Sequence, residues 1–539
     1  MHMKNAVKTA QVQSENAAAS TETIAQLENQ ITEQKSKIAE LEALVKFYEG
    51  QFRLQKHRQF GASSEKSAYD QPSLFNEAET VADAAGTEPT PEPELVEIQK
   101  HYRKRTRLIT DRLPEDLPVE IVVHELPEEE QICPECGGEL HVMGREKRRE
   151  LKIIPARAVI VEHVRKAYAC RACEQNAESV PVLKASAPEP VIRGSFAAPE
   201  TVAHIMCQKF VMGAPLYRQE QDWNRQGILL SRQTMSNWLL KATEDWLEPL
   251  YDALHERLCL RPVLHADETT LQVLHEPGKK AQSKSYMWLY RTSGDTKDPI
   301  VLYDYQPDRR KERPKDFLKG FKGYLHADGY DAYHDLPSDI VIVGCWAHAR
   351  RKWDEALKSL PEKDRAGSNV LRGKQYCDRL FELEREFADL PTEGRHKRRQ
   401  ERSKPLLEEF YAWISTLRAL PKTPIGIAVH YTLSQREYLE RYLLDGRLEI
   451  SNNRAERSIK PFVIDRKNFL FANTPRGARA SAIMFSLIET AKENGLNPHA
   501  YLTYVFQNAP NLNIRNNLSA LEQLLPHNVP KECRVSACV

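Results

Sequence analysis

The sequence predicts a multidomain α+β protein, and three observations support this fold class. Heptad spacing of apolar residues near the N-terminus predicts a long helix. Two CxxC pairs separated by strand-like runs predict a small metal-bound β segment. A helical pattern over 195–261 then gives way to strand patterns from residue 262. With 539 residues, 41% hydrophobic and 28% charged, the chain is too long for one core, and we expect about three or four domains.

Charge and hydropathy limit the classes of protein that fit. Lys and Arg number 77 and Asp and Glu number 76, so the chain is almost neutral. Any affinity for nucleic acid must therefore come from local segregation of charge. No run of about 18 apolar residues is present, and the first five residues do not open a signal peptide. We therefore expect a cytoplasmic protein with no membrane association.

Residues 20–56 predict a coiled coil. Apolar residues recur in steps of three and four, with Ile or Val at one heptad position and Leu mostly at the other, which favours parallel two-stranded coils. The series is Ile24, Leu27, Ile31, Gln34, Ile38, Leu41, Val45, Tyr48 and Phe52. An amphipathic helix packed on its own domain is the alternative. The coil predicts a homodimer or a higher homo-oligomer.

Residues 67–99 predict a linker, because this stretch is acidic, rich in Pro and too polar to form a core. Residues 100–107 reverse the sign with a compact group of Lys and Arg. This basic cluster suits phosphate contacts. It could equally neutralise the acidic linker within the chain.

Residues 100–185 also contain Cys133, Cys136, Cys170 and Cys173, arranged as two CxxC pairs around strand-like runs. The arrangement resembles a zinc ribbon with a long intervening hairpin. Four thiolates complete a tetrahedral site and leave no open position for catalysis, which predicts structural Zn²⁺. A redox role is the alternative, but one pair would suffice for that chemistry.

Residues 195–261 predict a helical DNA-binding segment. A helix from Pro215, a turn at Gly227 and a second helix capped by Ser231 have helix-turn-helix spacing. The second helix would present polar side chains able to reach bases or phosphates. These candidates are Arg232, Gln233 and Asn237. A plain packing unit of helices is the alternative.

Residues 262–490 predict a mixed core. Three strand-like runs, at 263–274, 286–291 and 300–305, predict an antiparallel meander. A helix-like stretch and two further strands follow. Asp267 lies in the first strand and Asp328 ends the fourth, and each is preceded by His-Ala. A carboxylate in such a buried position is costly unless it is paired or bound to a cation.

Glu456 stands in a strongly basic stretch near the end of the core. From Arg454 to Arg479 there are seven Lys or Arg residues against two acids. Helix N-cap residues precede Glu456, and Pro461 predicts that the helix ends or kinks there. A surface ion pair with Lys460 is the alternative.

The order of these elements is that of the ribonuclease H-like fold, in which two neighbouring strands and a late helix bring three carboxylates together. Such a group repels itself unless divalent cations lie within it, which predicts two Mg²⁺ or Mn²⁺ ions. Glu268 adjoins Asp267 but points to the opposite face of the strand. Asp331 fits ordinary turn chemistry.

The chain resembles DDE transposases of the insertion sequence 66 type over nearly its whole length. The resemblance rests on HADETT at 265–270, HADGY at 326–330, CWAHARRKW at 345–353, SNNRAERSIKPFVIDRKNFLFA at 451–472 and SLIETAKENGLNPHAYL at 486–502. It implies a catalytic trio of Asp267, Asp328 and Glu456, a helical insertion at 349–446 and a small C-terminal segment at 491–539. Accessory proteins of the same element and a nucleoid-associated location on DNA are also implied.

The implied function is cutting of the ends of an insertion sequence and joining of the 3′-hydroxyls to target DNA. Cys345, His348 and Lys460 are candidates for accessory roles at the site. The candidates for phosphate contacts are Arg350, Arg351, Arg454, Arg457, Arg466 and Lys467. The alternatives are a catalytically inactive DNA-binding regulator and a resolvase-type nuclease.

Overall fold

The computed structural model describes residues 158–164, 166–169 and 182–535, and seven separate positions between Ile31 and Glu49. Those seven positions are helical and exposed, and they include four residues of the heptad series: Ile31, Gln34, Ile38 and Val45. The remainder of the predicted coil, the linker and the basic cluster lie outside the described residues. So do Cys133, Cys136, Cys170 and Cys173. None of the described helices is long and apolar enough to cross a membrane.

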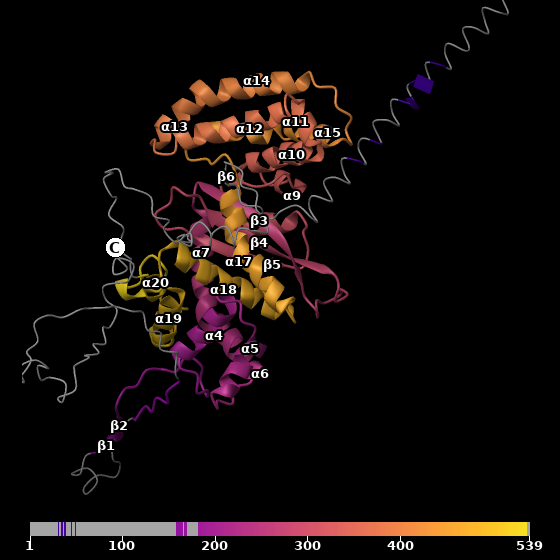
Figure 1. Cartoon of the computed structure of the whole chain (residues 1–539). Coiled ribbons are helices and arrows are strands. Elements are labelled where there is room, and N and C mark those ends of the chain that lie inside the picture. The colour runs from indigo at the N-terminus through magenta and orange to yellow at the C-terminus, as the bar shows by residue number, and fades with distance from the viewer. Residues whose placement is uncertain are drawn as a thin grey trace, which may run out of the picture.

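Short helices precede the sheet, as the sequence predicts (Figure 1). Gly227, with φ +77°, makes the turn before α6, and the Ser231 hydroxyl accepts the Thr234 N–H at 3.1 Å as the N-cap. Met235 and Trp238 are buried on the inner side of α6. The elements are β1 (Ala167–Ala169) and β2 (Val182–Lys184), which pair antiparallel, then α4 (Pro199–Phe210), α5 (Leu216–Arg225), α6 (Arg232–Ala242), the π-helix η3 (Thr243–Leu247) and α7 (Glu248–Cys259).

A five-stranded mixed sheet forms the centre, with strand order β5-β4-β3-β6-β7. The first three strands form the predicted antiparallel meander, while β6 runs parallel to β3 and β7 runs parallel to β6. The bounds are β3 (Val263–Gln272), β4 (Lys284–Thr292), β5 (Val301–Gln306), β6 (Gly323–His326) and β7 (Ile340–Val343). Two short helices, α8 (Glu312–Phe317) and α9 (Asp331–His334), lie between the strands in sequence.

A helical layer follows β7 and lies beyond one end of the sheet (Figure 1). Its core is aromatic, with Trp346 and Trp353 packed on Phe410. The elements are α10 (Trp346–Ser359), α11 (Glu362–Arg365), α12 (Asn369–Glu386), α13 (Thr392–Arg398), η4 (Arg399–Ser403), α14 (Lys404–Ser415), α15 (Pro424–Ser434), α16 (Arg436–Glu440) and η5 (Arg441–Leu443).

Helix α17 (Asn453–Phe469) was predicted to end or kink at Pro461, and of these two outcomes it does not end there. A proline removes one backbone donor and displaces the carbonyls of the preceding turn. Here the Ser458 carbonyl, three residues earlier, accepts a hydrogen bond from the Tyr303 hydroxyl of β5. This contact attaches the turn before Pro461 to the sheet.

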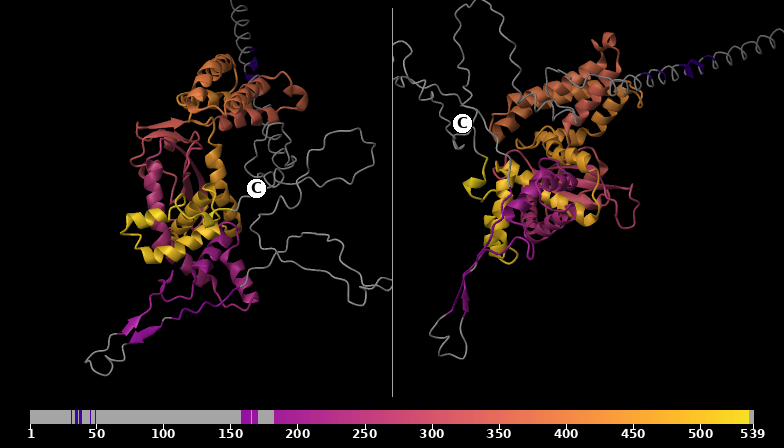
Figure 2. Two further views of the ribbon diagram at one scale, coloured as in Figure 1. Left: turned by 90° about the vertical axis from the view of Figure 1, so that its left-hand side faces the viewer. Right: turned by 60° about the horizontal axis from the view of Figure 1, so that its bottom comes forward.

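The C-terminal helices pack back onto the first ones. Helix α18 (Pro475–Glu493) lies along β5, and α19 (Pro498–Leu512) lies against α4. Figure 2 shows this close association from two further sides. One hydrophobic core extends from Val191 to Cys533. The last elements of the described residues are α20 (Leu518–Gln523) and η6 (Lys531–Cys533), and Cys533 is buried.

Candidate active site

Asp267 and Asp328 follow the paired His265 and His326 at the same spacing in sequence. In the parallel pair, Val263 lies opposite Tyr324 and His265 lies opposite His326. Asp267 lies two residues beyond His265 on β3, and Asp328 lies two residues after His326, where β6 has ended. Side chains two apart on a strand share a face, so Asp267 projects on the same side of the sheet as His265.

Glu456 approaches the same face from above. It lies in the first turn of α17, which packs on β3 and β4. The helix is fixed to the sheet through Ser458, whose hydroxyl accepts from the buried Arg291 of β4. Arg291 also makes two hydrogen bonds to Glu493 of α18, at 3.1 and 2.9 Å. The sheet therefore determines where the Glu456 carboxylate lies.

Electrostatics link the three acids. Burial raises the pKa of Asp267 well above its ordinary value, and the nearby carboxylates of Glu268, Glu456 and Asp328 raise it further. Among the residues that the structure describes, the carboxylate oxygens of Asp267, Asp328 and Glu456 do not all lie within 4.8 Å of one another. Carboxylates that share two ions about 3.5–4 Å apart need not meet that closely. A divalent cation would relieve their repulsion, so the residues fit such an ion.

Glu268 faces away from this group, as the strand geometry predicts. Its carboxylate is 3% exposed and accepts from the Arg309 guanidinium at 2.8 Å. The Tyr333 hydroxyl donates to the other oxygen at 2.5 Å. With these two partners, the Glu268 carboxylate is satisfied without a metal.

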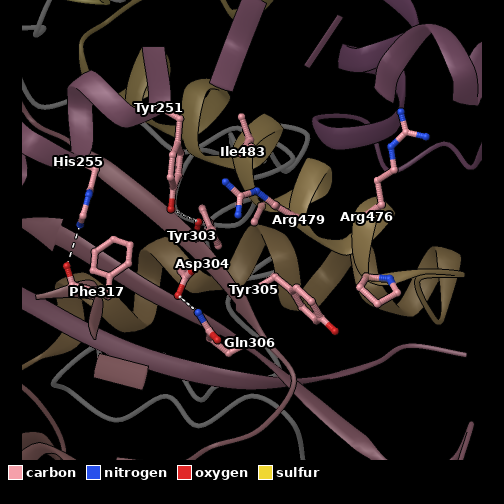
Figure 3. A pocket seen from close by; sticks show the side chains of 12 residues that line it. Tyr251, His255, Tyr303, Asp304, Tyr305, Gln306, Phe317, Arg476, Arg479 and Ile483 are labelled. Carbon is pink, nitrogen blue, oxygen red and sulfur yellow. Dashed lines mark hydrogen bonds between the residues drawn. The ribbon is translucent and has the colours of Figure 1, made fainter. Parts of the chain in front are cut away.

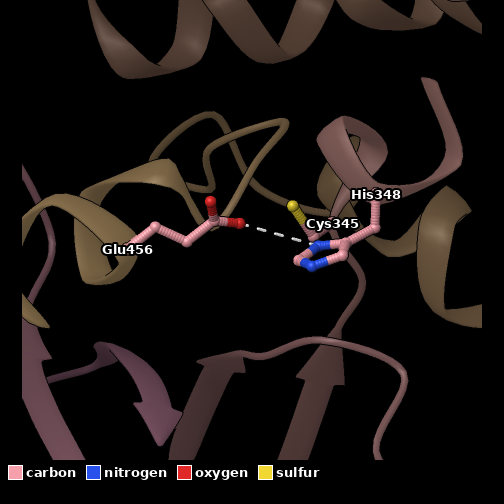
Figure 4. A group of neighbouring side chains, drawn as sticks. All are labelled: Cys345, His348 and Glu456. Carbon is pink, nitrogen blue, oxygen red and sulfur yellow. Dashed lines mark ion pairs between the residues drawn. The ribbon is translucent and has the colours of Figure 1, made fainter. Parts of the chain in front are cut away.

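Cys345 and His348 lie beside Glu456, at the start of α10 (Figure 4). His348 Nδ1 is 3.7 Å from Glu456 Oε1, and Arg351 Nη2 is 3.4 Å from Oε2. Burial, with the positive charge of Arg351, lowers the pKa of His348 to about 4. The imidazole is therefore neutral at neutral pH, and Arg351 is the cation that pairs with Glu456.

Asn452 connects the elements that carry the acids, a role that the sequence did not reveal. Although Asn452 occupies the N-cap position of α17, its side chain makes no capping bond. Instead its amide donates to the Ala266 carbonyl at 2.7 Å, and its oxygen lies 3.0 Å from His265 Nδ1. Its backbone N–H donates to Cys345 Sγ at 3.1 Å. Asn452 thereby joins α17, β3 and the start of α10.

A stacked pair of histidines supports this junction. The rings of His265 and His326 are parallel within 11°, with centroids 4.3 Å apart, and both are fully buried. His326 Nε2 accepts the Glu449 N–H at 3.2 Å. Burial lowers the pKa of His265 to about 4 and that of His326 well below its ordinary value. The only sequence signal for this pair was the repeated His-Ala-Asp.

Comparison with known protein families identifies the chain. The family model described as "Transposase IS66 family" matches residues 194–480, more than half of the chain. The chain belongs to this transposase family. Three further models match: the zinc-finger binding domain of transposase IS66 at 130–174, the IS66 C-terminal element at 486–527, and "Transposase C of IS166 homeodomain" at 48–122. The four cysteines of the CxxC pairs lie within the zinc-finger match, which supports structural zinc.

Relatives of similar length occur in Sinorhizobium fredii. Uncharacterized protein y4jD is 32% identical over 77% of this chain and 81% of that protein. Uncharacterized protein y4hP is 31% identical, and uncharacterized protein y4qI is 32% identical. Each of these two matches covers 74% of both chains.

The six Arg and Lys residues predicted to contact DNA phosphates differ in their exposure and in their partners within the protein. Arg350 pairs with Asp378 of α12 at 2.5 Å, and Arg454 pairs with Glu449 at 2.7 Å. Arg466 donates to Thr269 and Thr270 of β3. Among the six predicted, the exposed ones are Arg351, Arg457 and Lys467. Lys460 is half-buried, and burial lowers its pKa.

The predicted recognition helix presents its polar residues outward. Arg232, Gln233 and Asn237 are exposed on α6. Gln233 donates to Asn237 at 3.1 Å, and the Arg232 N–H donates to Glu220 of α5 at 3.0 Å. The helix therefore offers a continuous polar surface to a partner.

A cavity of about 450 Å³ lies elsewhere, between α7, β5 and α18 (Figure 3). Its polar groups have partners within the protein. Tyr251 donates to the Tyr303 carbonyl, His255 Nε2 lies 2.8 Å from the Phe317 carbonyl, and Asp304 accepts from Gln306. None of the three candidate acids lines it, so we do not assign it to the reaction.

Proposed function

We propose that this chain is a DDE-type transposase with a ribonuclease H-like core that cuts insertion-sequence ends and joins their 3′-hydroxyls to target DNA. The observation that supports the proposal is the parallel pairing of β3, which carries Asp267, with β6, which ends two residues before Asp328, together with the packing of α17, which carries Glu456, on β3 and β4. Membership in the transposase IS66 family supports the same chemistry. No covalent intermediate with the protein is required.

Asp267, Asp328 and Glu456 would hold two Mg²⁺ or Mn²⁺ ions. When bound, these ions would supply an activated water or 3′-hydroxyl and stabilise the leaving oxygen of the phosphodiester. Arg351 pairs with Glu456 Oε2, the carboxylate oxygen other than the one that faces His348. The exposed Arg457, in the turn of α17 that carries Glu456, would hold the DNA backbone beside the acids.

Other parts of the chain would supply DNA recognition and assembly. The exposed face of α6 would contact the terminal repeats, and the segment with the two CxxC pairs would hold its own fold through Zn²⁺. The exposed heptad residues Ile31, Ile38 and Val45 suit pairing with a second copy of the chain.

The test is cleavage of element-end DNA by the full chain with Mg²⁺. Glu456→Gln keeps the size of the side chain but removes its charge. We expect nicking to fall by at least about 100-fold while DNA binding is retained, because metal stabilisation is worth several kcal/mol. Glu401→Gln, in the helical layer, is the matched control and should nick normally.

Equal nicking by Glu456→Gln and wild type would refute the assignment. Wild type that binds but never nicks the ends would favour an inactive regulator. Cleavage of branched DNA without joining to a target would favour a resolvase-type nuclease.

A further inference from the structure

In the part of the chain that the structure describes, Cys345, His348 and Glu456 form a group of three potential metal ligands. Their donor atoms all lie within 4.8 Å of one another. Figure 4 shows the three side chains converging from α17 and from the start of α10. The group is distinct from the acid trio, although it shares Glu456 with it. A thiol, an imidazole and a carboxylate are a ligand set found in zinc sites.

Two atoms in this group lack hydrogen-bond partners. His348 Nδ1 and Glu456 Oε1 are both buried and unsatisfied, and they face each other at 3.7 Å. This separation is too long for a hydrogen bond. Buried polar atoms without partners are costly, so their orientation toward a common point needs an explanation. A cation between them would satisfy both.

The third ligand is arranged to support a thiolate. Cys345 Sγ accepts the N–H of Asn452 at 3.1 Å, and Cys345 occupies the N-cap position of the 14-residue helix α10. Backbone donors and a helix N-terminus both favour negative charge. Burial nevertheless raises the pKa of the free thiol to about 12. A coordinating metal deprotonates a thiol outright, so metal binding would supply what burial opposes.

We propose that Cys345, His348 and Glu456 bind Zn²⁺ or a similar thiophilic divalent ion, and that this ion withdraws Glu456 from the Mg²⁺ site. Mg²⁺ prefers oxygen ligands, whereas sulfur and imidazole favour zinc. Zinc bonds of about 2.0–2.3 Å separate tetrahedral ligands by roughly 3.3–3.8 Å. The group would therefore need to contract by no more than about 1 Å, which would leave a fourth position for water. Zinc is then an inhibitor of the magnesium-dependent reaction.

The binding test does not depend on the proposed function. Zinc bound per full-length chain is measured by titration against a chromophoric chelator. Cys345→Ser and His348→Gln should each bind one ion fewer than wild type, or bind that ion at least about 100-fold more weakly. Cys377→Ser, which changes another buried cysteine, is the control and should match wild type. Thermal unfolding of each variant verifies folding.

Cobalt provides an independent reading of the ligand set. The wild type minus Cys345→Ser difference spectrum should contain a thiolate-to-Co²⁺ charge-transfer band. Equal zinc stoichiometry in Cys345→Ser and wild type, or no such difference band, would overturn the site.

The inhibitory effect rests on the proposed function and is tested separately. Zinc is titrated into the Mg²⁺-supported nicking reaction, and activity with zinc is divided by activity without it for each variant. The inhibitory zinc concentration should rise at least tenfold in Cys345→Ser but not in Cys377→Ser. Loss of the zinc site with unchanged inhibition would refute the effect. Zinc binding by a wild-type protein that does not nick would refute the proposed function and leave the site intact.

Discussion

At the scale of single residues, Asn452 holds the elements of the candidate site together through its side chain and its backbone. It is 1% exposed, and its side chain bonds to the strand that carries Asp267. The Glu456 N–H also donates to its carbonyl, at 3.2 Å. A residue with suitable N-cap chemistry in the sequence is thus a buried connection between two acid-bearing elements.

Replacing Asn452 by Ala should therefore reduce both stability and cleavage. The change leaves the Ala266 carbonyl and His265 without their partner, which costs about 1–3 kcal/mol per buried group. Thermal unfolding and Mg²⁺-dependent nicking measure the two effects. Asn224→Ala, at an exposed position on α5, is the control. It should not change the stability, and it should not change the rate of nicking divided by the amount of DNA bound. Unchanged stability in Asn452→Ala would contradict this role.

The buried histidine pair predicts a pH dependence of stability. Because the folded pKa of His265, about 4, lies below its ordinary 6.5, the unfolded chain binds more protons between these values. Stability from this residue is complete above pH 6.5 and is lost as the pH falls toward 4, by up to about 1.4 kcal/mol per pH unit. The drop in unfolding temperature between pH 7 and pH 5 should be smaller in His265→Gln. An equal drop in both proteins would contradict the prediction.

At the scale of elements, α18 covers the edge of the sheet at β5. β5 is an edge strand, and two hydroxyls of α18 accept its outward N–H groups. The Tyr303 N–H donates to Ser486 at 2.7 Å, and the Val301 N–H donates to Thr490 at 3.0 Å. Covering an edge in this way satisfies its backbone and prevents pairing with another strand.

Thr490→Val should therefore destabilise the protein by about 1–3 kcal/mol, although the side chain keeps its shape. The variant leaves the Val301 N–H buried without an acceptor. Denaturant unfolding gives the difference in free energy. Ser481→Ala on the same helix is the control, since Ser481 bonds only within α18 to the Gly477 carbonyl. A loss as large in Ser481→Ala would show that the edge contact is not the cause.

Sequence periodicity predicted the elements better than their contacts. The meander, the strand that leads to Asp328 and the Ser231-capped helix are local patterns, and the structure confirms them. The sequence predicted that the helix ends or kinks at Pro461, and α17 continues past this residue to Phe469. The roles of Asn452 and Thr490 depend on which elements pack together, and such contacts leave no periodic signal.

At the scale of the whole molecule, segments far apart in sequence combine around the sheet. The parallel pairing of β3 and β6 brings together segments that β4, β5 and α8 separate in sequence, and α17 packs on β3 and β4 after the helical layer (Figure 1). One core joins α4, the sheet and the C-terminal helices. The sequence motifs identified the acids, whereas their proximity required the complete fold.

We propose that Asp267, Asp328 and Glu456 bind the catalytic metal ions. The most direct test replaces the Asp328 carboxylate by a thiolate and asks whether Mn²⁺ restores the activity. Asp328→Cys is assayed for nicking of element-end DNA in Mg²⁺ and in Mn²⁺, beside wild type. A thiolate ligand binds Mg²⁺ poorly and Mn²⁺ better. If Asp328 is a metal ligand, the variant should lose nicking in Mg²⁺ and regain a measurable part of it in Mn²⁺. Wild-type nicking by Asp328→Cys in Mg²⁺ would show that Asp328 is not a ligand of the catalytic metal.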